Sequence, residues 1–229
     1  MRIAALSAAI VAAGIWFGQA SSRAATGGTV VGTVTTRAQA LRPIRVTIDP
    51  SVCGQTVPDE SIVVDAAGHL SGAVVTVSGQ RAVAPAEAVV TNEGCRFGPR
   101  VSILRPKGTV KMASKDPVLH TMHAVAGDGR PMFNVSLPFQ NVSLSRPVTK
   151  TGVVTVSCST HTWMRGYLVV TDEISAVSDA AGVFRLENVP VGVQEIRIWH
   201  EALHGVSQRV TVKDGETTRV DFVLGDGPR

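Results

Sequence analysis

Three side chains that can bind a metal stand at three-residue spacing in one short segment: Cys158, His161 and Met164. Cys158 ends the apolar, Val-rich stretch 153–158, which is typical of a strand, and His161 and Met164 follow it. A thiolate, an imidazole and a thioether are together the donors that copper prefers, and a long thioether contact tunes its potential. His120 is the candidate for a second imidazole. The pattern therefore predicts one mononuclear copper site that cycles between Cu(II) and Cu(I).

Each of these residues alone has a plainer explanation. A buried free cysteine is often only a small core residue, Met164 could pack in a core, and His161 could be an ordinary loop residue. The combination favours copper. His123 lies three residues beyond His120, so on an extended segment it should face elsewhere. The loop has no second cysteine for a dinuclear copper centre, and three cysteines are too few for an iron–sulfur cluster.

The cysteine count is odd, which matters in an oxidising compartment. Cys53 and Cys95 each stand beside a glycine in loop-like sequence, so the simplest arrangement is a disulfide between them that leaves Cys158 free for a metal. Such a bridge would contribute about 4 kcal/mol in the chain-entropy description. The alternative is that both cysteines are unpaired thiols.

Residues 1–24 have the character of a bacterial signal peptide. Arg2 precedes the apolar run Ile3–Gly18, and the small residues Ser22 and Ala24 occupy plausible cleavage positions. This run is shorter than the roughly 20 residues of a membrane span, although an uncleaved anchor is the alternative. The remaining chain has no spanning stretch. We therefore expect a periplasmic or secreted protein.

The net charge is +4 and falls to about +2 without the two arginines of the leader. A nucleic-acid partner would require a dense basic face. The composition therefore argues against nucleic acid as a partner.

The sequence after the leader predicts an all-β protein. Short runs rich in Val and Thr alternate apolar and polar residues between Gly, Pro and Asp, as in the strands of a sandwich or barrel. The expected strands are 29–35, 44–48, 61–64, 73–77, 101–104, 109–112, 153–158 and 167–171, then 182–186, 193–199, 206–212 and 217–224. A boundary is expected between residues 172 and 173.

Two resemblances follow from these residues. Cys158-x-x-His161-x-x-Met164, with His120-Thr-Met-His123 upstream, resembles the ligand loops of amicyanin-type and plastocyanin-like cupredoxins. This resemblance implies a cupredoxin-like Greek-key β-sandwich over residues 25–172, with His120, Cys158, His161 and Met164 as copper ligands. Thr121 stands where those proteins have an Asn that ties the two ligand loops together.

The segment 178–199, with its Asp-x-x-Gly and Pro-x-Gly turns, is similar to carboxypeptidase-regulatory-like modules. That family implies a small transthyretin-like β-sandwich over residues 173–229, in a structural or binding role. The two-part layout resembles proteins described as methylamine utilization proteins.

Trp163 and Tyr167 flank the ligand loop. The plainer interpretation is core packing or loop cover. The alternative is an apolar docking face, because brief encounters between redox proteins use small interfaces.

A second motif, His200-Glu201-Ala-Leu-His204, matches the letters of a zinc-protease helix. Both histidines reach one zinc ion only when residues i and i+4 share a helix face. Here five residues lie between two strand-like runs, which favours a hairpin loop.

The sequence thus predicts an electron carrier that exchanges single electrons with redox partner proteins and is not an enzyme. The alternatives from other classes are a Cu(I) storage or delivery protein, a non-catalytic β-sandwich scaffold and, least favoured, a zinc hydrolase.

Overall fold

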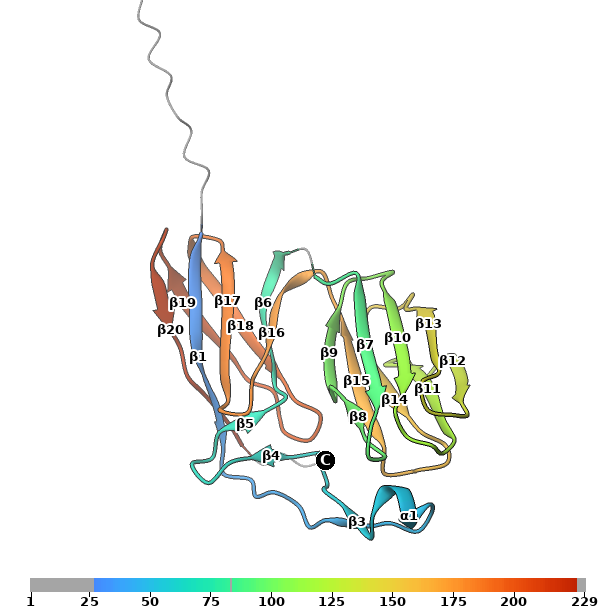
Figure 1. Ribbon diagram of the computed structural model, residues 1–229. Helices are drawn as coiled ribbons and strands as arrows, with labels where there is room; N and C mark the ends of the chain where they lie inside the picture. The colour runs from blue at the N-terminus through green and yellow to red at the C-terminus, as the bar shows by residue number, and fades with distance from the viewer. Residues whose placement is uncertain (1–26, 83, 226–229) are drawn as a thin grey trace, which may run out of the picture.

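Two separate hydrophobic cores organise the chain. The computed structural model describes residues 27–82 and 84–225, so the expected leader lies outside the described residues. One core gathers side chains from residues 46–57 and 88–170, and the other gathers side chains from residues 30–38, 62–77 and 174–224. We call these the ligand-bearing unit and the terminal unit. Figure 1 shows them as two packed groups of strands side by side.

The ligand-bearing unit is a sandwich of two sheets. One sheet has the strand order β13-β10-β7-β8 and the other has the order β12-β11-β14-β15-β9. The strands of the first are β7 (Glu87–Asn92), β8 (Phe97–Gly98), β10 (Thr109–Ser114) and β13 (Ser143–Pro147). Those of the second are β9 (Val101–Leu104), β11 (His120–Ala126), β12 (Pro131–Leu137), β14 (Gly152–Ser157) and β15 (Arg165–Val170). Alternate residues of β11 and β14 are buried, as expected for strands that cover a core on one face.

The terminal unit is a second sandwich. One sheet contains β17-β1-β20, with β21 also pairing β1, and the other has the order β16-β6-β18-β19. Its strands are β1 (Gly28–Thr36), β6 (Val74–Arg81), β16 (Glu173–Val177), β17 (Val183–Val189), β18 (Gly192–Trp199), β19 (Ser207–Val212), β20 (Thr217–Arg219) and β21 (Phe222–Leu224). The expected all-β sandwich architecture is confirmed, and the fold contains one short helix besides its strands in the described residues.

The packing divides the chain differently from the expected ranges 25–172 and 173–229. Strand β1 is antiparallel to β17 and parallel to β20 and β21, so residues 28–36 belong to the terminal unit. β6 pairs with β16 and β18 in the same unit. The physical reason is size: the C-terminal strands alone form too small a core, and strands from the N-terminal part complete both of its sheets.

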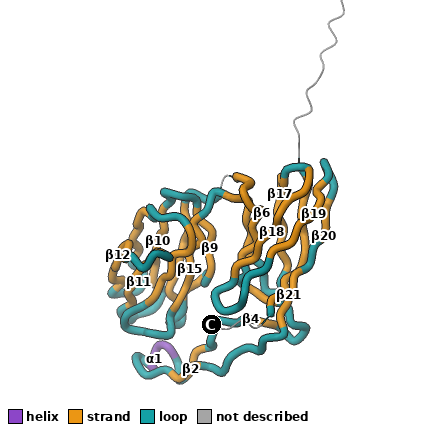
Figure 2. Tube along the Cα trace, turned by 180° about the vertical axis from the view of Figure 1, so that it is seen from behind, coloured by secondary structure: helices purple, strands orange, loops and turns teal. Residues whose placement is uncertain are grey.

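A long connection joins β1 to β6, two strands of the terminal unit, and on its way contributes side chains to the core of the ligand-bearing unit. We call its residues 39–61 the strap. It contains β2 (Ile44–Arg45), helix α1 (Pro50–Cys53) and β3 (Thr56–Val57). Beyond it, β4 (Val63–Val64) and β5 (Leu70–Ser71) lead back to β6. Figures 1 and 2 both show this connection along one end of the molecule, with α1 beneath the ligand-bearing unit.

Several elements differ from the sequence expectation. β7, β11, β12 and β13 were not expected as strands, and residues 173–177, taken as part of a boundary segment, form β16. Within the part of the chain that the structure describes, no helix has the length and apolar character needed to cross a membrane.

Candidate metal centre

Two neighbouring strands bring the expected ligands to one end of the ligand-bearing unit. β11 begins at His120, and β14 ends one residue before Cys158. The two strands are antiparallel, with His123 opposite Ser157, so the start of one lies beside the end of the other. The loop 158–164 then turns back into β15 and carries the other two expected ligands.

The structure brings three of the expected ligands together. One ligand atom each of His120, Cys158 and His161 lie within 4.8 Å of one another. All three side chains are buried, with exposures of 0%, 3% and 0%. The imidazole rings have centroids 4.7 Å apart, and His161 Nδ1 lies 3.8 Å from the Cys158 sulfur. A buried cluster of two nitrogens and a sulfur is a donor set suited to copper.

Met164, the fourth expected ligand, is buried at the end of the same loop, with 2% exposure. Its N–H donates to the carbonyl of His161 at 2.9 Å, and its carbonyl accepts from the N–H of Cys158 at 3.2 Å. These two backbone bonds close a tight turn that holds Cys158, His161 and Met164 in one compact loop.

The Cys158 sulfur is surrounded by donors. The N–H groups of Thr121 and His161 point to it at 3.3 and 3.4 Å. Burial alone would raise the pKa of this thiol, but the nearby His120 imidazole and these two N–H groups outweigh burial and lower the pKa to about 5. The lowered pKa favours the deprotonated thiolate of Cys158, which is the form that binds a metal.

Burial favours the neutral form of His120, whereas the neighbouring thiol of Cys158 and the carboxylate of Asp116 favour the charged form and raise its pKa. Each group thus favours the charged form of the other, although the geometry of the described residues places no hydrogen bond between His120 Nδ1 and the Cys158 sulfur.

His120 supplies a test of whether these residues fit a metal. Its Nδ1 atom is buried and has no hydrogen-bond partner among the described residues, while its Nε2 atom bonds Asp116. An unpaired buried polar atom costs about 1–3 kcal/mol and calls for an explanation. A copper ion held by His120, Cys158 and His161 would satisfy this nitrogen, so these three donors fit the metal.

Thr121 replaces the Asn of the resembled family and still ties the ligand loops together. Its hydroxyl accepts from the N–H of Ser159 at 2.7 Å and lies 3.7 Å from the Cys158 sulfur. A threonine therefore links the start of β11 to the ligand loop.

Two carboxylates that the sequence analysis did not single out bond the outer nitrogens of the histidines. Asp116 Oδ2 lies 2.9 Å from His120 Nε2, and Asp49 Oδ2 lies 3.1 Å from His161 Nε2. Asp116 precedes His120 by four residues, a nearby signal that could have marked it. Nothing local marks Asp49, which reaches the site from the strap.

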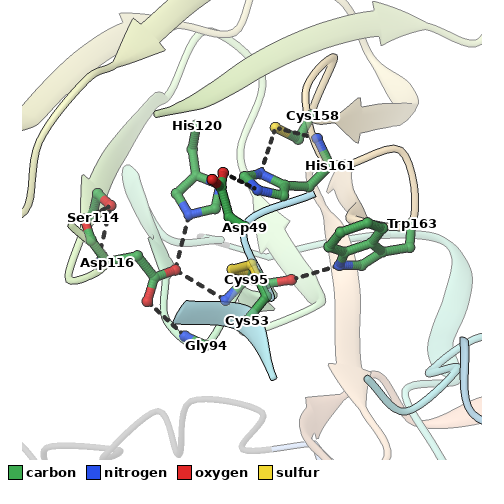
Figure 3. The surroundings of a disulfide bond; sticks show 10 residues. All are labelled: Asp49, Cys53, Gly94, Cys95, Ser114, Asp116, His120, Cys158, His161 and Trp163. Atoms are coloured by element: carbon green, nitrogen blue, oxygen red, sulfur yellow. Dashed lines mark hydrogen bonds and ion pairs between the residues drawn. A yellow bond between two sulfur atoms is a disulfide. The ribbon is translucent and has the colours of Figure 1, made fainter. Parts of the chain in front are cut away.

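The expected disulfide between Cys53 and Cys95 is present and joins the strap to the loop between β7 and β8. Its sulfurs lie close to the site, because ligand atoms of Cys53, Cys95 and His161 fall within 4.8 Å of one another. Cys158 is the free cysteine of the described chain and is buried. Figure 3 shows the disulfide, both histidines and both carboxylates in one cluster.

The remaining aromatic and histidine candidates do not add donors to the cluster of His120, Cys158 and His161. His123 alternates with the buried residues of β11 and thus faces away from the site, as expected. Trp163 is partly buried, donates to the carbonyl of Cys95 at 3.1 Å and stacks edge-on against His161. Tyr167 packs against Trp199 of the terminal unit, with ring centroids 5.4 Å apart. Both rings pack against neighbours, in line with the plainer interpretation, and both stay partly exposed, so the docking face remains a prediction.

The segment from His200 to His204 forms a loop after β18, as the spacing arguments favoured. His200 is buried, whereas His204 is exposed. Glu201 is bound by Arg100 through two short contacts of 2.6 and 2.7 Å. The segment therefore lacks the helix that the zinc-protease arrangement requires and instead connects the two units.

Solved structures of cupredoxins are similar to part of this chain. No family model matches the sequence, and no curated protein matches it. A solved purple cupredoxin from Nitrosopumilus maritimus is similar at 20% identity over 37% of this chain and 99% of its own, with a TM-score of 0.33. A reduced Cu(I) amicyanin variant is similar at 22% identity over 42% and 98%, with a TM-score of 0.33, and an oxidised amicyanin variant at 21% over 42% and 98%, with a TM-score of 0.34.

Proposed function

We propose that this chain is a mononuclear copper protein that carries single electrons between redox partner proteins. The observation that supports this most directly is the buried cluster of His120, Cys158 and His161, in which His120 Nδ1 lacks a hydrogen-bond partner among the described residues. A bound copper ion would supply one-electron chemistry by changing between Cu(II) and Cu(I).

The residues of the chain would act by holding a fixed donor set. His120 and His161 provide nitrogen, Cys158 provides a thiolate and Met164 provides a thioether. The Thr121 and His161 N–H groups stabilise charge on the sulfur. A rigid sandwich keeps these groups in place, and little reorganisation favours rapid electron exchange. Four donors from the chain leave no obvious position for a substrate, which supports an electron carrier over an enzyme.

The terminal unit is proposed to be a non-catalytic module similar to carboxypeptidase-regulatory-like domains. The support is its separate all-β core and its loop at residues 200–206, which Arg100 ties to the ligand-bearing unit. We propose a periplasmic or secreted location, because the Cys53–Cys95 disulfide suits an oxidising compartment.

Titration of the purified mature protein with Cu(II), followed in the visible spectrum, tests this function. The wild type is expected to develop an intense thiolate-to-copper band that saturates at one equivalent. Cys158→Ala is expected to lose the band. His123→Ala, altered on the opposite face of β11, serves as the matched control and should retain it.

The outcomes separate the candidate functions. A saturable band with fast electron self-exchange supports the electron carrier. Tight Cu(I) binding without such a band sinks the electron-carrier proposal and favours storage or delivery. If the folded wild type binds neither Cu(II) nor Cu(I), the remaining candidate function is a non-catalytic scaffold.

A further inference from the structure

The strap is attached to the metal centre at two points. Asp49 reaches His161 Nε2 at 3.1 Å, and four residues later Cys53 forms the disulfide with Cys95. Between these points Val52 and Cys53 donate their N–H groups to the carbonyl of Asp49 at 3.0 and 2.9 Å. A single turn of helix α1 therefore couples the position of the Asp49 carboxylate to that of the disulfide.

Asp49 is in an unusual local state for its position. It stands at the N-cap of α1, where an Asp side chain normally accepts from the first N–H groups of the helix, but it makes no such bond. Its φ of 52° places it in the left-handed region, which costs a non-glycine residue free energy. Asp49 therefore makes no stabilising hydrogen bond to the helix that it precedes. Its carboxylate instead points to His161, as Figure 3 shows.

The contact has a consequence for His161. A carboxylate accepts from an N–H, so Asp49 favours the tautomer with its proton on Nε2. That tautomer leaves a lone pair on Nδ1, which lies 3.8 Å from the Cys158 sulfur and faces the other ligands. The His161 ring is fully buried, whereas the Asp49 side chain is 37% exposed, so the contact lies where the buried site meets solvent.

His120 is supported in the same way from the other side of the disulfide. Asp116 bonds His120 Nε2 and also accepts from the N–H groups of Gly94 and Cys95 at 2.8 and 2.9 Å. The disulfide therefore connects the backbone that holds Asp116 with the strap that carries Asp49.

We infer that the strap is part of the metal centre: Asp49 is a positioning residue for His161, and the Cys53–Cys95 disulfide keeps it there. This inference rests on the proposed copper function for its metal readouts. Carboxylates that bond the outer nitrogen of a metal-binding histidine fix its ring and raise its basicity. Because the carboxylate is also a negative charge, it should favour Cu(II) over Cu(I).

The first test uses the copper-free protein and so does not depend on the proposed function. The tautomers of the histidine rings would be read by nitrogen-15 NMR in the wild type, in Asp49→Ala and in Asp59→Ala. Asp59 is a matched control, because its carboxylate lies on the same strap and bonds Ser61. We expect an Nε2–H signal for His161 in the wild type and the control and its loss in Asp49→Ala. An unchanged His161 signal in Asp49→Ala overturns the positioning role.

The second test measures copper binding and the reduction potential in the same three proteins. Loss of an outer partner typically weakens metal binding 10–100-fold. We expect weaker Cu(II) binding in this range for Asp49→Ala and a higher potential, by about 59 mV for each tenfold preferential loss of Cu(II). Values equal to those of Asp59→Ala overturn the inference. A wild type with no copper band instead rejects the proposed function and leaves the tautomer result standing.

The role of the disulfide is tested with the double variant Cys53→Ala/Cys95→Ala. If it folds, it is expected to lose the same His161 signal and to bind Cu(II) more weakly, in the direction of Asp49→Ala. A folded double variant with the wild-type signal and affinity overturns the role of the disulfide. If the variant unfolds, the disulfide is required for the site to exist, and Asp49→Ala decides the role of the carboxylate.

Discussion

The N–H of Cys95 donates to the carboxylate of Asp116 at 2.9 Å, so a disulfide cysteine holds the group that bonds His120. Asp116 is almost fully buried, and it also accepts from Gly94. The hydrogen bond that holds the partner of His120 and the covalent link to the strap therefore lie at one residue, Cys95.

The first prediction follows from this relationship. Asp116→Ala removes the carboxylate that bonds the N–H groups of Gly94 and Cys95 and the imidazole of His120, so all three groups lose this partner. Hydrogen bonds to charged groups contribute about 1.5–3 kcal/mol each, so we expect the copper-free protein to lose at least about 2 kcal/mol in denaturant unfolding. Asp128→Ala, which alters an exposed carboxylate, should change stability by less than about 0.5 kcal/mol. Equal effects for the two variants would contradict the assignment.

A second prediction concerns the hydroxyl of Thr121. Thr121→Val keeps the shape of the side chain and the N–H to the Cys158 sulfur, but removes the acceptor for Ser159. We expect a loss of about 1 kcal/mol in denaturant unfolding. Thr121→Asn restores an acceptor and should recover part of this loss. No loss in Thr121→Val would show that the hydroxyl does not tie the loops together.

A third prediction tests the junction between the two units. Arg100 binds Glu201 through two nitrogens, and their side chains are 17% and 7% exposed. Arg100→Met leaves the Glu201 carboxylate buried without its partner, which should cost about 3 kcal/mol in denaturant unfolding. Adding Glu201→Leu should recover most of the loss, because both charges are then absent.

The control for this junction is the more exposed pair Arg197 and Glu173, with side chains 52% and 23% exposed. Arg197→Met should cost less than about 1 kcal/mol. If Arg100→Met costs no more than this control, Arg100 and Glu201 contribute little to joining the units.

A fourth prediction concerns pH. Tyr167 is the single tyrosine of the chain, so absorbance of the tyrosinate form reports it alone. Burial and the neighbouring Glu201 carboxylate raise its pKa from 10.0 to about 12. The titration midpoint should lie near pH 12 in the folded protein and move down in Glu201→Gln. A midpoint near pH 10 in protein shown by circular dichroism to be folded would contradict the packing of Tyr167.

The sign of the stability effect follows from the direction of this shift. The neutral phenol is favoured in the folded state, so its contribution is fully present below pH 10, where the unfolded chain is also protonated. As pH rises from about 10 to 12, the unfolded state loses the proton first, and the contribution disappears. Denaturant unfolding of the wild type and Tyr167→Phe across this window measures the difference.

The sequence predicted that His120, Cys158 and His161 come together, and the structure brings them together. The disulfide was predicted from the odd cysteine count and is present. Cys158, His161 and Met164 share one turn, and His120 begins a neighbouring strand. Asp49 could not be predicted, because it meets His161 only through the path of the strap. A carboxylate in a loop carries no mark of the partner to which the fold brings it.

The same distinction explains the fold. Individual strands such as β1 and β18 alternate buried and exposed residues and are recognisable locally. The partners of β1 lie near the other end of the chain, and no local pattern specifies a parallel pairing at such a distance. Residues 173–177 lie between two groups of expected strands, which predicts a boundary, whereas pairing with β6 makes them a strand.

The connectivity of β1 determines the order in which the molecule can be completed as it is synthesised. The ribosome synthesises the chain from its N-terminus. β1 is therefore made long before β17, and Thr33 is present before its strand partner Val183. Cys95 follows Cys53 far sooner. The strap can therefore be fastened while β1 still lacks its sheet, and the terminal unit closes last, around a strand that is already tethered. The C-terminal strands are thus the final step in assembling the whole chain rather than an independent addition to a finished ligand-bearing unit.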